Sequence, residues 1–217
     1  MNIERARFNM IEQQIRPWEV LDGRVLALLQ QMPRELFVPD TERELAFADI
    51  DIPLAHGQSM MAPKVEARLL QALNIKPTDR VLEIGTGSGY LTALLAKMAK
   101  HVYSVDIHAS FKEQAADKLA RVAVKNVTLE TGDAAQGWRK HAPYDVMVVT
   151  ASCPQLPEIF GQQLAINGRL FAVVGQAPAM EALLITRTGD NAWARESLFE
   201  TVLPPMENLP APRKFVF

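Results

Sequence analysis

The chain has 217 residues, of which 48% are hydrophobic and 22% charged, proportions typical of one globular domain with additions and not of a disordered chain. Its formal net charge of -2 provides no basic field for a polyphosphate, so no nucleic-acid partner is expected. Small molecules or proteins are the expected partners.

Cys153 is the only cysteine, which excludes an intrachain disulfide and argues against a cysteine-ligated metal site. Residues 1–16 mix charges throughout, and no stretch approaches the roughly 20 apolar residues that span a membrane. His101, His108 and His141 lie in charged, surface-like segments without metal-ligand spacing. We therefore expect a cytoplasmic chain with no export signal, no membrane segment and no metal, in which Cys153 is a packing residue.

The N-terminal part of the chain is predicted to be helical. Apolar residues recur at helical spacing from Ile3 to Ile15, and Pro17 is expected to end this helix. Asp22 is suited to cap a second helix, which Pro33 stops. These residues are interpreted as a helical extension of the main domain.

A loop separates this extension from the rest of the chain. A short extended stretch, 49–54, precedes the sequence HGQSMMAP, which we call the HGQ loop (residues 56–63). After it, apolar residues at helical spacing predict a helix over 65–73. We divide the chain into the extension with its active-site loop, 1–60, packed on a main domain, 61–217.

From residue 80 onward, predicted strands alternate with amphipathic helices. This alternation favours a parallel sheet covered on both faces by helices through right-handed crossovers, so the fold class is doubly wound α/β. After GRLFAVVG, two strand-like runs separated by the turn signal GDN predict that the sheet finishes with an antiparallel hairpin. The predicted parallel strands are RVLEIG, HVYSVDI, VTLETGD and YDVMVVTAS.

Three of these strands end in residues suited to bind a ligand: Gly85 to Gly89, Asp106 and Asp133. Ligands of such sheets bind at the carboxyl ends of the strands. The glycines lack the last position of the dinucleotide fingerprint, which is Tyr90, and no lysine follows to make a P-loop. Each feature has a simpler explanation when taken alone: the glycines form a tight turn, Asp106 caps a helix, and Asp133 caps a turn. Their occurrence together, in order at successive strand ends, favours a nucleoside site in which Asp106 accepts hydrogen bonds from ribose hydroxyls.

The motifs VLEIGTGSGY, SVDI, TGDAAQGW and YDVMVVTAS resemble those of class I S-adenosylmethionine-dependent methyltransferases. This resemblance implies a Rossmann-like, seven-stranded sheet, mostly parallel with a terminal antiparallel hairpin. More narrowly, FVPD, AFAD, HGQSMMAP, GTGSGY, GDAAQGW and QLAINGRLFAVVG resemble the protein-L-isoaspartate O-methyltransferases, from about Pro33 to Gly175. The implied activity is methylation of a carboxylate of isoaspartyl residues in damaged proteins, a repair reaction.

The resemblance also implies which residues hold the cofactor, S-adenosyl-L-methionine. Its methionine part would lie against the glycines and Glu83, Asp106 would hold the ribose, and Asp133 with Ala134 would border the adenine. The implied cofactor-binding residues are Gln58, Glu83, Gly85, Thr86, Gly87, Ser88, Gly89, Asp106, Ile107, Asp133 and Ala134.

The HGQ loop departs from the family pattern, which is HGQ, Thr, an aliphatic residue, Ser, then Pro two positions on. Met61 stands in the place of the family's catalytic serine, and a thioether cannot donate a hydrogen bond to the acceptor carboxylate. Losing such a donor costs on the order of 1 to 3 kcal/mol, so activity is expected to fall without disappearing. Ser59 would substitute if the loop shifts register, and His56 would contact the acceptor. The candidate catalytic residues are thus His56, Ser59 and Met61.

Several alternatives stay open at this point. Met60 and Met61 form an apolar wall for a small apolar or aromatic acceptor, or they are ordinary core packing. The protein then methylates a different small acceptor, or it binds S-adenosylmethionine without catalysis. The proline-rich segment after residue 200 is predicted to be an extended cover, with 215–217 as an apolar anchor, and the chain is expected to be a monomer or a weak homodimer.

Overall fold

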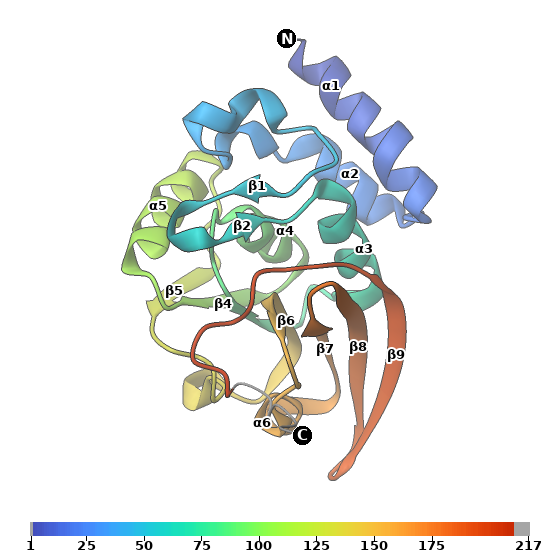
Figure 1. Cartoon of the computed structure of the whole chain (residues 1–217), viewed down its shortest axis with the longest axis vertical. Coiled ribbons are helices and arrows are strands. Elements are labelled where there is room, and N and C mark those ends of the chain that lie inside the picture. Colours follow the sequence, from blue (N-terminus) through green and yellow to red (C-terminus); the bar gives the residue numbers. More distant parts are fainter. Residues whose placement is uncertain (1, 211–217) are drawn as a thin grey trace, which may run out of the picture.

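The computed structural model describes residues 2–210 and contains a seven-stranded sheet (Figure 1). The strand order is β5-β4-β3-β6-β7-β8-β9, with β3 to β7 parallel and β8 and β9 antiparallel to their neighbours. The predicted doubly wound sheet with its terminal hairpin is confirmed. The strands are β3 Arg80–Ile84, β4 His101–Asp106, β5 Val127–Thr131, β6 Tyr144–Cys153, β7 Leu164–Gln176, β8 Ala179–Gly189 and β9 Ala192–Glu200.

Most helices begin and end near the predicted positions. Asp22 caps α2 by accepting a hydrogen bond from the Arg24 N–H. One boundary prediction was wrong: Pro17 does not end the first helical run, which continues as a 3₁₀ turn through Trp18, because proline is tolerated in the first turn of a helix. The α-helices are α1 Ile3–Met10, α2 Gly23–Gln31, α3 Pro63–Leu73, α4 Tyr90–Met98, α5 Ala109–Arg121 and α6 Glu158–Gln162.

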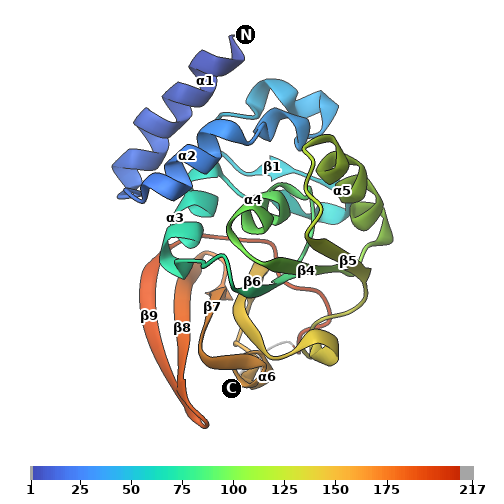
Figure 2. The ribbon, with the colours of Figure 1, turned by 180° about the vertical axis from the view of Figure 1, so that it is seen from behind.

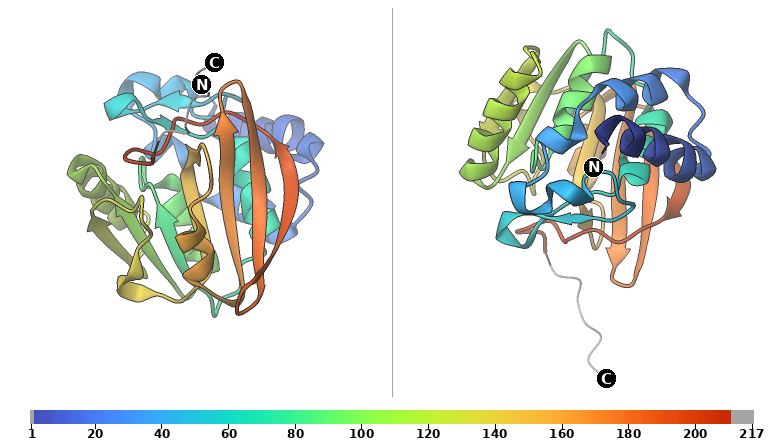
Figure 3. Two further views of the ribbon diagram at one scale, coloured as in Figure 1. Left: turned by 60° about the horizontal axis from the view of Figure 1, so that its bottom comes forward. Right: turned by 90° about the horizontal axis from the view of Figure 1, so that it is seen from above.

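The two faces of the sheet are covered unequally. Side chains alternate along β3, so Val81 packs against the N-terminal helices, α3 and α4, whereas Leu82 and Ile84 pack on the other face with Phe160 of α6. Figures 2 and 3 show α3, α4 and α5 on the same side of the sheet as the N-terminal helices. The second face has only the short α6, a 3₁₀ turn and loops among the described residues.

The N-terminal extension shares its hydrophobic core with the sheet. The ring of Phe37, for example, is fully buried and lies 5.5 Å from the ring of Tyr90, the first residue of α4. Within the extension, β1 (Ile52–Pro53) pairs antiparallel with β2 (Ser59–Met60), and this pairing holds together the two ends of residues 54–58, which include the HGQ sequence. The division of the chain at residue 60 stays a prediction. No helix between residues 2 and 210 is long and apolar enough to cross a membrane.

After β9 the chain returns across the sheet, as Figures 1 and 2 show. We call residues 203–208 the C-terminal strap. The Ser152 N–H donates to the Pro204 carbonyl, and the Met206 N–H donates to the Ser152 carbonyl, each at 2.8 Å. These bonds fix the strap beside the carboxyl end of β6. The apolar anchor predicted at 215–217 lies outside the described residues.

Candidate active site

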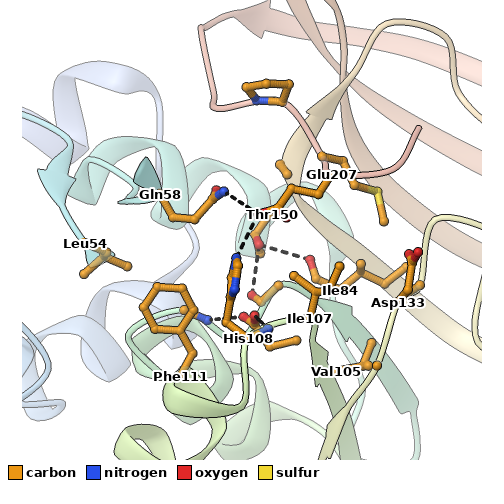
Figure 4. A pocket seen from close by; sticks show the side chains of 18 of the residues that line it. Leu54, Gln58, Ile84, Val105, Ile107, His108, Phe111, Asp133, Thr150 and Glu207 are labelled. Carbon is orange, nitrogen blue, oxygen red and sulfur yellow. Dashed lines mark hydrogen bonds and ion pairs between the residues drawn. The ribbon is translucent and has the colours of Figure 1, made fainter. Parts of the chain in front are cut away.

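A cavity opens at the carboxyl ends of β3, β4, β5 and β6, where the sequence predicted a ligand site (Figure 4). We call it the strand-end cavity. Its floor comes from the strand ends, one side from the HGQ loop with Leu54, and the opposite cover from the strap. Its apolar lining includes Leu54, Ile84, Val105, Ile107 and Phe111.

The glycine loop brings bare backbone to this floor. Gly85 has φ +98, and a β-carbon there would overlap the Thr150 hydroxyl oxygen. That hydroxyl is itself fixed, since it lies 3.0 Å from the Ile84 carbonyl and 2.9 Å from the Gly85 carbonyl. Gly89 has φ +82 and would meet the Ala115 side chain at 2.9 Å. Glycine is required at both positions by conformation and by space.

Asp106 presents a carboxylate to the cavity from the end of β4. Its side chain is held in place by the Gly87 N–H, which donates at 3.0 Å, and the His108 N–H, which donates at 2.9 Å, to different oxygens. Each carboxylate oxygen has two acceptor sites, so both remain able to accept another hydrogen bond. Asp106 therefore fits a ligand that carries two neighbouring hydroxyls, such as a ribose.

Asp133 and Ala134 also line the cavity, beyond the end of β5. One oxygen of Asp133 accepts from the Ala135 N–H and the other from the Asn208 amide, each at 2.8 Å. With Ile107 on the neighbouring strand end, Ala134 gives this end of the cavity apolar surfaces that suit a flat aromatic base.

Glu83 differs from its predicted neighbours because it does not line the cavity. Its carboxyl is fully buried beneath the glycine loop and accepts hydrogen bonds from Thr92 at 2.5 Å and Ser104 at 2.6 Å. Burial without a cation raises the pKa of Glu83 to about 8, so the group is mostly protonated at neutral pH. The structure therefore does not support a contact between Glu83 and the cofactor ammonium.

The remaining predicted cofactor residues also divide into some that line the cavity and some that do not. Gln58, Gly85, Gly87 and Ile107 lie on the cavity wall, whereas Thr86, Ser88 and Gly89 shape the loop from behind. The Thr86 hydroxyl bonds to Ser104 at 2.6 Å, and Ser88 accepts from the Tyr90 N–H at 3.2 Å. As a whole, the lining fits an adenosyl group, with carboxylates for hydroxyls and apolar walls for the base.

Comparison with known proteins agrees with this geometry. The model of the protein-L-isoaspartate(D-aspartate) O-methyltransferase family matches residues 5–207. A protein-L-isoaspartate O-methyltransferase of Rhodopseudomonas palustris is 41% identical over 198 residues, which cover 91% of each chain. This chain belongs to that family.

Other members of the protein-L-isoaspartate O-methyltransferase family are similar over most of their length. One from Methanoculleus marisnigri is 41% identical, covering 85% of this chain and 84% of its own. A crystal structure of a putative Plasmodium falciparum member, in complex with S-adenosyl-L-homocysteine, has a TM-score of 0.77 and covers 95% of this chain and 99% of its own. At 20% identity, that likeness shows the shared fold.

In this family member, the HGQ loop places Ser59 and Met61 in different surroundings. Ser59 lines the cavity, whereas the side chains of Met60 and Met61 are 3% and 4% exposed and belong to the hydrophobic core. The interpretation of the two methionines as an apolar wall of the cleft is therefore wrong, and the alternative of core packing describes them. Met61 cannot touch an acceptor from this position, so its predicted catalytic role is not supported.

His56 lies beside the cavity without lining it. Its ring is exposed, stacks on the His108 ring at 3.9 Å and 5°, and bonds to the Ser110 hydroxyl at 3.0 Å. His108, which the sequence analysis placed in a surface-like segment without a role, does line the cavity, and its Nε2 lies 2.8 Å from the Glu207 carboxylate. His108 follows Asp106 by two residues, and this position just after a strand end is the signal that could have identified it.

The strap contributes residues that the sequence analysis did not assign to the site. Pro205, Met206 and Glu207 line the cavity, and Gln58 donates to the Glu207 carboxylate at 3.4 Å (Figure 4). The sequence predicted an extended cover here but gave no signal for its path.

A buried network behind the HGQ loop was also missed. Arg34 is 1% exposed, pairs with the carboxylate of Glu66, and donates to the Met61 carbonyl at 2.7 Å and the Ala46 carbonyl at 2.9 Å. Its guanidinium lies 4.8 Å from the centre of the Tyr90 ring. Burial raises the pKa of Glu66 to about 7, and Arg34 opposes that rise.

Cys153 is fully buried at the end of β6, in the core beneath the second face of the sheet. Burial raises the pKa of its thiol to about 12, so the reactive thiolate is not formed near neutral pH. Cys153 thus has the surroundings of a packing residue.

Proposed function

We propose that the protein transfers a methyl group from S-adenosyl-L-methionine to the free carboxylate of isoaspartyl residues in damaged proteins. The observation that carries this proposal is the strand-end cavity, which presents Asp106 and a bare glycine loop to an adenosyl ligand in a chain of this family. The named activity of the R. palustris relative supports the same acceptor.

The chain's own residues divide the work of binding. We assign the ribose to Asp106, the base to the surfaces of Ile107 and Ala134, and the remaining end of the cofactor to the backbone at Gly85 and Gly87. When bound, the cofactor would supply an electrophilic methyl group on its sulfonium sulfur, and transfer of that methyl to the carboxylate oxygen would release the neutral thioether S-adenosyl-L-homocysteine, a good leaving group. An ionised acceptor carboxylate needs no general base at pH 7, so the protein contributes mainly position and exclusion of water.

Ser59 is the residue we assign to orient the acceptor. It is the hydroxyl of the HGQ loop that reaches the cavity, whereas the position of the family's serine is occupied by a buried methionine. A hydroxyl donates one hydrogen bond to a carboxylate, and such bonds to charged groups contribute about 1.5 to 3 kcal/mol. Ser59 thus replaces the missing donor from a position two residues earlier.

Transfer of labelled methyl to an isoaspartyl peptide, with the matching aspartyl peptide as control, tests these assignments. We expect wild type to methylate the isoaspartyl peptide selectively, Ser59→Ala to lose about ten- to a hundredfold in kcat/KM, and Met61→Leu to stay within about twofold. Cofactor affinity should change little in either variant. Cofactor binding without transfer to the peptide would contradict the proposed acceptor and favour another substrate or a binding role.

We further propose that the protein works in the cytoplasm as a monomer or weak homodimer and that it binds no nucleic acid. The single cysteine supports a reducing compartment, because the chain has no partner for an intrachain disulfide. The net charge of -2 supports the absence of a nucleic-acid partner.

A further inference from the structure

A second cavity lies on the other side of the C-terminal strap. It is bordered by the end of β7, the start of β8 and the strap itself. Two residues, Ser59 and Pro205, line both this cavity and the strand-end cavity. A group-transfer enzyme must bring two ligands to one point, and these shared residues mark where the two cavities meet.

The second cavity has a mainly apolar lining. Met180, Leu203 and Pro204 contribute apolar surface, and Met180 is a flexible side chain that adapts to different shapes. Asp51 is the one charged residue among those that line it, and neither lysine nor arginine is present in its lining. Asp51 is exposed as a residue, but its carboxylate accepts a hydrogen bond from the Ala62 N–H at 2.7 Å and is partly buried at the rim, within the fields of Arg34 and Lys64.

We propose that this second cavity binds the residue next to the isoaspartyl group of the acceptor chain, and that its lining selects an apolar or cationic side chain over an acidic one. The assignment rests on the proposed function, because it takes the reacting carboxylate to lie at Ser59. The acceptor chain that carries this carboxylate then extends into the second cavity, because the strand-end cavity, which Ser59 also lines, is assigned to the cofactor.

The discrimination has two physical sources. An apolar neighbour side chain buries surface against Met180 and Leu203, while an acidic one loses hydration there without gaining a partner. An acidic side chain is also repelled by Asp51, and a cationic one is attracted. Because Arg34 and Lys64 offset part of the Asp51 charge, we expect a preference of only about fivefold to tenfold in kcat/KM.

Three isoaspartyl peptides that differ at the flanking residue, Leu, Lys or Glu, test the assignment with the full chain and labelled S-adenosylmethionine. Wild type should prefer the Leu and Lys peptides over the Glu peptide. Asp51→Asn keeps an oxygen for the Ala62 N–H and removes the charge, so it should reduce the Lys-to-Glu ratio to within about twofold. Met180→Ala should reduce the Leu-to-Glu ratio.

Asp190→Asn is the matched control, since Asp190 is also an exposed aspartate, lies in the turn between β8 and β9, and lines neither cavity. It should leave all three rates unchanged, and cofactor affinity should be equal in every variant. Equal rates for the three peptides, or a Lys-to-Glu ratio that Asp51→Asn does not move, would overturn the assignment and leave the proposed function intact. Binding of cofactor without transfer to any of the peptides would overturn both.

Discussion

The two sides of the strand-end cavity are built by different means. The glycine-loop side is local: Gly85 and Gly87 take their conformation from the turn between β3 and α4. The HGQ-loop side is held by distant residues, because Arg34 lies 27 residues before Met61 and 32 before Glu66, whose positions it fixes. The conformation of the glycine-loop side is thus determined by a short stretch of sequence, whereas the HGQ-loop side forms only once the N-terminal extension has packed on the sheet.

This difference explains why the HGQ-loop side tolerates a change of side chain better than the glycine-loop side does. Backbone of the glycine loop lines the cavity itself, and positive φ angles and close neighbours restrict its sequence. On the HGQ side the backbone path is set from behind through the Met61 carbonyl, and the side chain at 61 packs into the core. A methionine at 61, where the family pattern implies a serine, thus fills the core behind the loop and supplies no hydroxyl.

The largest expected effect comes from Arg34→Met on the HGQ side. This change leaves the Glu66 carboxylate buried without its cation, which should lower the free energy of unfolding by about 3 to 5 kcal/mol. Denaturant unfolding of the single variant and of Arg34→Met/Glu66→Met checks it, since the double variant removes both charges and should recover much of the loss. Wild-type stability of the single variant would contradict a network that holds the loop.

Glu83→Gln tests the side behind the glycine loop through its pH dependence. The folded pKa of Glu83, about 8, lies above the ordinary 4.5, so the folded protein keeps a proton that the unfolded chain releases. Stability is therefore lost as pH rises from about 4.5 to 8, by an amount on the order of 4 kcal/mol for this group. Glu83→Gln does not titrate there.

Unfolding measured across that pH range should show the difference between Glu83→Gln and wild type moving in favour of the variant as pH rises. Glu113→Gln, on the exposed side of α5, is the control and should follow wild type. Cofactor affinity of Glu83→Gln should remain within a few fold, because the carboxyl does not reach the cavity. If the free energy of unfolding varied with pH in the same way for Glu83→Gln and wild type, the assignment of a buried, protonated carboxyl at Glu83 would be wrong.

The smallest expected effect on stability is that of Gly85→Ala, about 2 kcal/mol, from positive φ and the clash with Thr150. Its effect on cofactor binding should be larger, at least tenfold by titration calorimetry, because the backbone would have to shift away from the ligand. Gly87→Ala is a matched comparison: its β-carbon would lie 3.4 Å from a Leu54 methyl group, an ordinary contact, so the loss should be smaller. Equal losses of cofactor affinity in the two variants would show that positive φ alone, and not the clash with Thr150, restricts the loop to glycine.

Local patterns predicted the sheet, the terminal hairpin and the position of the strand-end cavity. Alternation of strands and helices and the glycine spacing are short-range features, and Asp106 and Asp133 follow directly from the strand ends. The sequence could not show that Glu83 turns away from the ligand, because that direction depends on the pleat of β3 and on Thr92 and Ser104.

The other residues missed by sequence reasoning come from long-range packing. Glu207 meets His108 across 99 residues and Gln58 across 149, and no local pattern records such a pairing. Arg34, in the sequence PRELF, carries no local signal of burial, because its partners Glu66 and the Met61 carbonyl come from distant parts of the chain. The register of the HGQ loop likewise depends on β1 pairing with β2 and not on the residues 56–63 alone.

The strap also makes the ligand site depend on a segment that follows every strand of the sheet in the chain. A chain cut between β9 and the strap would keep the glycine loop, Asp106 and Asp133, yet would lack Pro205, Met206 and Glu207 from the cavity wall. A protease cut at this one place would therefore open the cavity without removing any strand of the sheet.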